Sequence, residues 1–151
     1  MATRSTLGSQ KFKALLTSLS NQAEFICQPC DGLADAIEHH DTIKTKALCA
    51  DYTSVIGHFG IQAGDVDTLV LGCTHYPFAS QYLQERVGPE VRLLGNGAPI
   101  ARQARQRLTV VATPTGPGLC VLLTTGTPDT LQTGAQRWLG LPNPLVRSLS
   151  V

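Results

Sequence analysis

The chain has 151 residues, of which 42% are hydrophobic and 15% are charged, and its formal net charge is +1. Because soluble domains carry about 25% charged residues, this low charge and the ample apolar side chains exclude disorder as the main state. The near-neutral balance excludes nonspecific nucleic-acid binding, and no apolar run approaches the roughly 18 residues of a membrane span.

Helices and one short strand are predicted for the first sixty residues. An apolar stripe predicts a helix over residues 6–19. Residues 24–28 predict a short strand. Pro29 suits a first helical turn, so it opens a helix over residues 29–38, and a further helix follows over residues 43–59.

Strands and helices alternate in the rest of the chain. Residues 67–72 form a continuous apolar run, typical of a strand that is buried on both faces of a parallel sheet. The next predicted elements are a helix over 76–87, a strand over 91–94, a helix over 98–108, a strand over 119–123 and a helix over 128–139. The stretch 113–118, rich in Thr, Pro and Gly, predicts a turn or loop. This alternation predicts an α/β fold with a parallel sheet flanked by helices.

The five cysteines are an odd set scattered through the chain: Cys27, Cys30, Cys49, Cys73 and Cys120. We interpret them as reduced thiols of a cytoplasmic protein, since a chain of this length needs no disulfide staples and begins without the apolar core of a signal peptide. Cys27 and Cys30 form a Cys-x-x-Cys pair. Both a thioredoxin-like redox role and a plain core role, with Cys27 ending a buried strand, remain open for them. No cysteine and histidine set has the spacing of a zinc site, so no metal is expected.

The segment LVLGCTHYPF, residues 69–78, carries the candidate chemistry. Ligands of open α/β sheets bind beyond the carboxyl ends of the strands, where this apolar run delivers Gly72, Cys73, Thr74 and His75. Gly72 permits a sharp turn, and Cys73 can act as a nucleophile or a proton-transfer base. Thr74 can offer its hydroxyl and N–H to a carboxylate, and His75 can exchange a proton with a substrate or tune the thiol. The structural alternative is a buried cysteine followed by a histidine that caps the next helix.

The string LVLGCTHYP closely resembles the second catalytic cysteine motif of glutamate racemases, in the cofactor-independent aspartate/glutamate racemase superfamily. The resemblance extends over most of the chain. Residues 2–12 resemble the threonine-rich loop and helix that open the second domain of that family, and residues 30–38 match its Cys-Pro…Val-Glu segment. Residues 91–102 resemble its Val-Asp-Ser-Gly stretch, although Gly95 stands where Asp is usual, and residues 122–140 resemble its closing strand, turn and helix.

The resemblance implies racemisation of glutamate without a cofactor, which supplies D-glutamate for bacterial peptidoglycan. It implies that Cys73 is one of two thiols that handle the α-proton and is the one facing L-glutamate. It also implies that His75 assists proton transfer and that Glu38 is an acidic helper, whereas the residues alone leave Glu38 open as a solvated helix-end side chain. The substrate-contacting positions that the resemblance implies are Thr3, Thr6, Thr74 and His75.

The chain lacks one part of the family's machinery. Inverting a stereocentre by proton transfer requires an acid/base group on each face of the α-carbon. The family supplies its other thiol from an N-terminal domain, in an Ala-Cys-Asn-Thr segment that this sequence does not contain. The resemblance therefore implies that residues 1–94 are a second racemase domain and residues 95–151 a tail that would complete a missing first domain. We expect exposed apolar faces on this tail, which a separate N-terminal half or a second copy of the chain would cover.

Two alternatives remain open for the function. Some members of the superfamily decarboxylate malonates with only the second-site cysteine, which predicts carbon dioxide release that depends on Cys73. The chain could instead be an inert remnant that binds a carboxylate or a protein partner. That alternative predicts no turnover and a Cys73→Ala variant altered only in binding.

Overall fold

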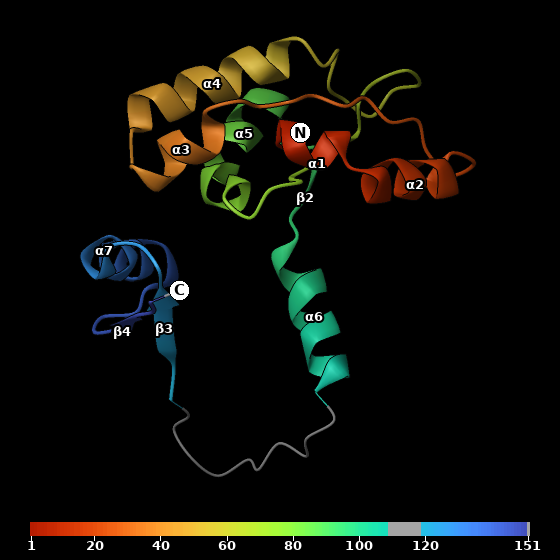
Figure 1. Cartoon of the computed structure of the whole chain (residues 1–151). Helices are drawn as coiled ribbons and strands as arrows, with labels where there is room; N and C mark the ends of the chain where they lie inside the picture. The colour runs from red at the N-terminus through yellow and green to blue at the C-terminus, as the bar shows by residue number, and fades with distance from the viewer. Residues whose placement is uncertain (109–118, 151) are drawn as a thin grey trace. The chain divides into compact units, whose positions relative to one another are not determined.

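The computed structural model describes residues 1–108 and 119–150, and the chain divides into two compact units, Met1–Arg107 and Leu108–Val151. Figure 1 shows the elements of both units. The predicted loop over residues 113–118 lies outside the described residues. Among the described residues, none of the helices combines the length and the apolar character that crossing a membrane requires.

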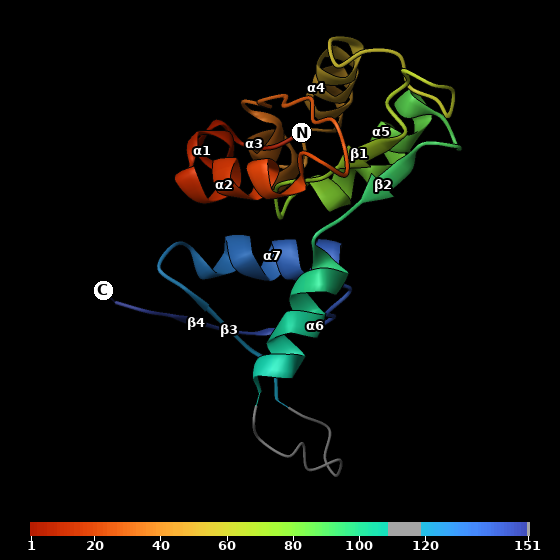
Figure 2. The same ribbon diagram turned by 90° about the vertical axis from the view of Figure 1, so that its right-hand side faces the viewer.

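Unit 1 contains a small parallel sheet. Strand β1 (Thr68–Val70) pairs with β2 (Arg92–Leu94), and Figure 2 shows the two strands side by side. Exposure alternates along the chain here, at 3% for Leu69, 46% for Val70 and 2% for Leu71. Such an alternation marks a strand with one covered and one open face. The predicted parallel strand is confirmed, but its predicted burial on both faces is wrong.

Single-residue bridges add two further segments to this sheet. Ala2 forms parallel bridges with Gly72 and with Pro29. Backbone hydrogen bonds of 2.9 to 3.1 Å hold the three segments together. Because bridged parallel segments run in the same direction, the residues that follow them lie at one edge of the sheet. These residues are Thr3, Cys30 and Cys73.

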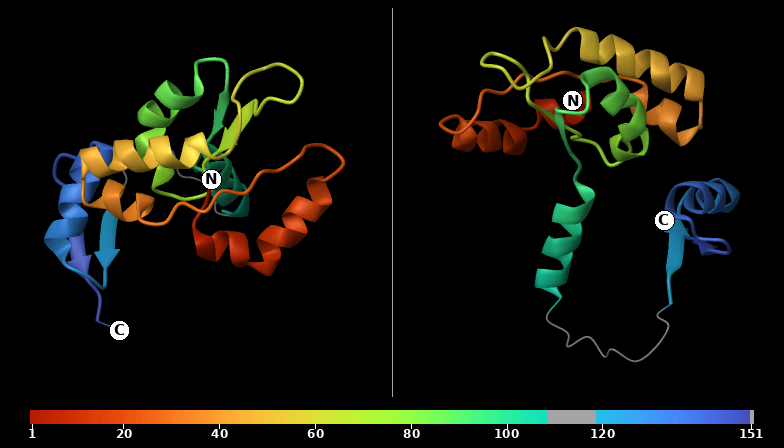
Figure 3. Two further views of the ribbon diagram at one scale, coloured as in Figure 1. Left: turned by 90° about the horizontal axis from the view of Figure 1, so that it is seen from above. Right: turned by 180° about the vertical axis from the view of Figure 1, so that it is seen from behind.

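Helices supply most of the core of unit 1. Helices α3 (Leu33–Glu38) and α5 (Ser80–Val87) both pack against α4 (Thr42–Ser54), as Figure 3 shows. The 3₁₀ turn η1 (Tyr76–Ala79) leads into α5 and packs against α3. The largest fully buried side chains come from these elements and are Leu33, Cys49, Tyr76 and Leu83.

Three elements differ from the prediction. Helix α3 begins at Leu33 rather than at Pro29, because Pro29 pairs with Ala2 and Gly32 forms the N-cap in the left-handed region at φ 76°. Residues 24–28 are not a strand, since regular pairing does not extend back from the single bridge at Pro29. Helix α4 ends at Ser54, short of the predicted residue 59, and the chain then turns away through Gly57 at φ 141°.

The predicted helix over residues 6–19 is two helices, α1 (Arg4–Gly8) and α2 (Gln10–Leu19). Ser9 separates them with an extended backbone at φ −72° and ψ 142°. Its side-chain oxygen accepts a hydrogen bond from the Phe12 amide at 3.2 Å. Serine is a favoured N-cap residue, so this local bond stabilises a new helix start in place of continuous helix.

Unit 1 ends with α6 (Gly97–Arg107), close to the predicted helix over 98–108. Unit 2 is a strand–helix–strand unit in which α7 (Pro128–Leu139) joins the parallel strands β3 (Val121–Thr124) and β4 (Leu145–Ser148). Helix α7 matches its prediction, with Pro128 at its first turn and Gly140 as its left-handed C-cap. Strand β4 is not predicted by the sequence pattern. The predicted α/β class with parallel strands is confirmed.

Candidate active site

Cys73, His75 and Glu38 form a line of polar side chains at the carboxyl end of β1. The Cys73 Sγ lies 3.9 Å from the His75 Nδ1, and the His75 Nε2 lies 3.5 Å from the Glu38 Oε2. Cys73 and His75 come from the loop between β1 and η1, whereas Glu38 is the last residue of α3. The packing of η1 against α3 brings the two elements together. The His75 side chain is 36% exposed and that of Glu38 57%, so a small molecule can reach them.

This arrangement suits proton transfer. When the Nε2–H of His75 donates to the Glu38 carboxylate, the Nδ1 is left as an acceptor that faces the Cys73 thiol. The imidazole can then take the thiol proton while the carboxylate stabilises the positive charge. The Thr74 hydroxyl oxygen lies 3.4 Å from the same Nδ1, so it adds a second polar contact beside the thiol.

Thr3 and Thr6 lie together at the start of α1, and Thr3 follows the segment that pairs with Gly72. Their hydroxyl oxygens are 2.9 Å apart, and the Thr6 amide donates to the Thr3 hydroxyl at 3.2 Å. This pair therefore caps α1. Both side chains are half-buried rather than covered. The structure brings Thr3 to the same sheet edge as Cys73. The contacts between Thr3 and Thr6 are separate from those that join Cys73, His75 and Glu38.

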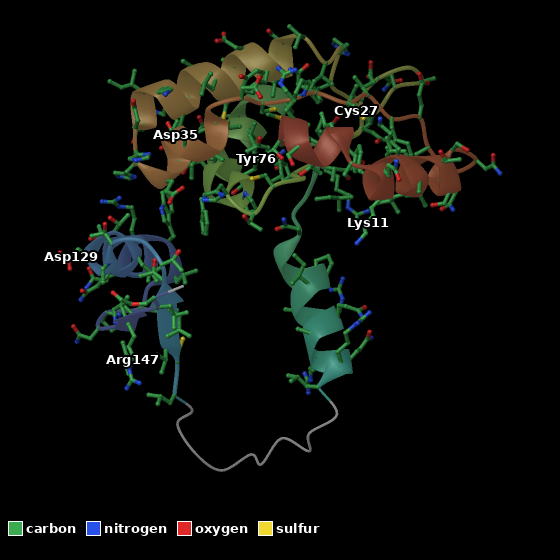
Figure 4. The ribbon with its side chains drawn as sticks, in the orientation of Figure 1. Lys11, Cys27, Asp35, Tyr76, Asp129 and Arg147 are labelled. Atoms are coloured by element: carbon green, nitrogen blue, oxygen red, sulfur yellow. The ribbon has the colours of Figure 1, made fainter. Side chains whose placement is uncertain are left out.

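The other cysteines have different surroundings from Cys73. All five cysteines are free. Cys27 is exposed, so of the two open interpretations the one that has it end a buried strand is wrong; Figure 4 labels it on the segment before α3. Burial raises the pKa of the Cys30 and Cys49 thiols to about 11. A thioredoxin-like pair would lie between a strand and the start of a helix, whereas residues 24–28 form no strand and α3 begins only at Leu33. Across residues 1–108 and 119–150, no cluster of three or more side chains could hold a metal ion.

Two features beside the site are not signalled by the sequence. Arg4 forms an ion pair with Asp31, its Nε lying 3.1 Å from the Oδ2, and this hydrogen bond lowers the pKa of the Asp31 carboxyl. The hydroxyl of the buried Tyr76 donates to the Cys30 carbonyl at 3.2 Å. Both contacts join residues far apart in the sequence. The one sequence signal that could have pointed to Tyr76 is its position directly after His75.

Comparison with known proteins gives consistent results, although no family model matches the chain. The glutamate racemase of Stutzerimonas stutzeri is 39% identical over 110 residues, which are 72% of this chain and 40% of that protein. The glutamate racemase of Herpetosiphon aurantiacus is 36% identical over 134 residues, which are 85% of this chain and 50% of that protein. The chain thus spans about half the length of the curated relatives that it matches.

Solved structures show the same relation. A glutamate racemase isoform from Bacillus anthracis matches 96% of this chain and 54% of its own at a TM-score of 0.76 and 24% identity. The Escherichia coli glutamate racemase, solved with L-glutamate and the activator UDP-MurNAc-Ala, matches 99% of this chain and 56% of its own at a TM-score of 0.71 and 21% identity. These likenesses show the fold. Together with the sequence identities, they make the chain a homologue of glutamate racemases over about half of their length.

Proposed function

We propose that this chain supplies one proton-transfer face of a glutamate racemase active site, with Cys73 as the thiol that meets L-glutamate. The sequence likeness to glutamate racemases supports the substrate class. The observation that carries the proposal is the contact chain of 3.9 Å from Cys73 to His75 and 3.5 Å from His75 to Glu38. A thiol next to a base that a carboxylate can stabilise is suited to proton transfer without a cofactor.

The chemistry begins with the Cys73 thiol proton. His75 takes this proton at its Nδ1, and Glu38 stabilises the imidazolium. The Cys73 thiolate then removes the α-proton of glutamate, so that an S–H bond forms as the C–H bond breaks and the electron pair remains on the α-carbon. Return of a proton from Cys73 regenerates the same enantiomer. Inversion requires delivery by a second acid/base group on the opposite face.

Threonine hydroxyl groups near the Cys73 thiol, together with His75, would bind the substrate. We assign the α-carboxylate and amino group of glutamate to Thr3, Thr6, Thr74 and His75. The pairing of Ala2 with Gly72 supports this assignment, because it sets Thr3 at the same sheet edge as Cys73. The exposed Thr74 and the half-buried Thr3 and Thr6 remain open to a small ligand. The hydroxyls can donate to the carboxylate and accept from the ammonium group.

We also propose a domain organisation, a covering partner and a cellular compartment for the protein. Residues 1–94 act as the second racemase domain and residues 95–151 as a tail that completes a first domain. Exposed apolar side chains in the tail support a covering partner, which would be a separate N-terminal half or a second copy of the chain. The most exposed of them are Ile100, Leu108, Leu119, Leu123 and Leu139. The protein would work in the cytoplasm and supply D-glutamate for peptidoglycan.

Protection of Cys73 from alkylation tests the proposed binding of glutamate. We expect L-glutamate at ten times its Kd to slow the alkylation of Cys73 by iodoacetamide about tenfold, because the bound substrate covers the thiol. Peptide mass spectrometry follows each cysteine, and the exposed Cys27 is an internal control whose rate stays constant. Equal rates for Cys73 with and without glutamate would contradict the proposal. Protection by a malonate alone would favour the decarboxylase alternative.

A further inference from the structure

The loop that carries Cys73 and His75 is fastened at both of its ends. At its start, the Gly72 amide donates to the Met1 carbonyl at 2.9 Å. At its end, the Tyr76 hydroxyl donates to the Cys30 carbonyl at 3.2 Å, across 46 positions of sequence. These two bonds leave only Cys73, Thr74 and His75 between the anchors.

The acceptor of the Tyr76 hydrogen bond lies at the entry to α3. The Cys30 carbonyl also accepts from the amide of Leu33, the first residue of that helix, at 3.4 Å. Helix α3 spans only Leu33–Glu38, so its last residue is the carboxylate that faces His75. One carbonyl therefore connects the residue after His75 with the short helix that ends in Glu38.

The Tyr76 side chain is suited to hold this connection. It is completely buried, and Figure 4 labels it within unit 1. Burial, with smaller contributions from Cys30 and Cys73, raises the pKa of the Tyr76 phenol above its usual value. The hydroxyl therefore stays protonated, and remains a hydrogen-bond donor, throughout the neutral and mildly alkaline range.

Building on the proposed function, we propose that Tyr76 is a positioning residue whose hydrogen bond to the Cys30 carbonyl sets His75 against Glu38. As a positioning residue, Tyr76 acts through the loop that carries His75 rather than on the substrate. Without its hydroxyl, the ring stays in the core but the loop loses its tie to the start of α3. The 3.5 Å contact between His75 and Glu38 then becomes one of several positions that the loop samples. Small displacements of catalytic groups have large effects on rate.

A double-mutant cycle between Tyr76→Phe and Glu38→Gln tests this role. Its readout is the rate at which iodoacetamide alkylates Cys73, measured on the full chain by peptide mass spectrometry. We expect Glu38→Gln to slow alkylation in the parent chain. In the Tyr76→Phe chain its effect should be smaller by about threefold or more, since Tyr76 holds the loop through which Glu38 meets His75 and residues linked in one network couple. Tyr52→Phe is the matched control, because the Tyr52 hydroxyl donates to the neighbouring Asp31 carbonyl at 2.7 Å without holding the His75 loop.

The two proposals fail in distinguishable ways. Equal effects of Glu38→Gln in the parent and Tyr76→Phe chains would overturn the positioning role, as would an equally large loss of coupling in the Tyr52→Phe chain. Alkylation needs no glutamate, so these outcomes do not depend on the substrate. Absence of any protection by glutamate would instead overturn the proposed function and leave the coupling between Tyr76 and Glu38 intact. Circular dichroism verifies that each variant is folded.

Discussion

Replacing Cys73 by serine is expected to slow the exchange of the α-proton of L-glutamate by about 10²- to 10⁴-fold, the range that a positioned acid/base group contributes. Serine keeps the shape of the side chain, but its hydroxyl is a far weaker acid than a thiol. It therefore gives up its proton to His75 much less readily. Loss of the α-proton signal in deuterated water, followed by proton NMR, measures the rate.

The matched control for this variant is Cys27→Ser. Cys27 is also a free thiol of the same unit, but it is exposed and lies before α3 rather than in the loop after β1. We expect Cys27→Ser to exchange the proton at the parent rate. A Cys73→Ser chain as active as the parent would show that another group removes the α-proton.

Replacing Gly72 by alanine is expected to lower the free energy of unfolding of unit 1 by about 1–3 kcal/mol, the usual cost of overpacking. A β-carbon at Gly72 would lie 3.0 Å from the Ala2 β-carbon and 3.0 Å from the Met1 carbonyl oxygen. Because one of these atoms belongs to the backbone, the segment before Thr3 would have to move away from β1. The variant should also weaken glutamate binding, since that segment carries Thr3 to the site.

Gly8→Ala is the control for this change. Gly8 ends α1 in the same unit, and a β-carbon there would meet nothing within 4 Å. Urea unfolding followed by tyrosine fluorescence reports on unit 1, since Tyr52, Tyr76 and Tyr82 all lie in it whereas the single tryptophan, Trp138, lies in unit 2. Equal stability of the Gly72→Ala and Gly8→Ala chains would contradict the close approach of Ala2 to Gly72.

The sequence predicts those parts of the fold that local chemistry decides. Helix α7 has its proline at the start and its glycine at the end, and it is predicted with the bounds that the structure shows. Ser9 is a local signal too, but the helix predicted from the apolar stripe at residues 12–19 extends back across it to residue 6. Residues 24–28, before Pro29, resemble a strand in composition. Their pairing depends on Ala2, far away in the chain, and consists of a single bridge at Pro29. The sequence pattern therefore predicts a strand where the structure has only this bridge.

In the candidate site, too, the sequence identifies what is adjacent in the chain and misses what distant contacts bring together. Cys73, Thr74 and His75 are adjacent in a recognisable motif, so the sequence identifies them as a group. Glu38 is predicted only through the family resemblance, and the structure brings it to 3.5 Å from His75 through the packing of η1 on α3. The sequence does not identify Tyr76 as a site residue. Its partner is a backbone carbonyl 46 positions away, and every residue has a backbone carbonyl, so the amino-acid pattern does not indicate this contact.

The central claim is that this chain carries one working face of a racemase site, and one measurement tests it directly. The unmodified chain is incubated with L-glutamate and with D-glutamate in deuterated water, and both deuterium content and chirality are determined. We expect deuterium to replace the α-proton of L-glutamate, the product to remain L-glutamate and D-glutamate to stay unlabelled. Conversion of either enantiomer into the other by this chain alone, or no deuterium in L-glutamate, would contradict it.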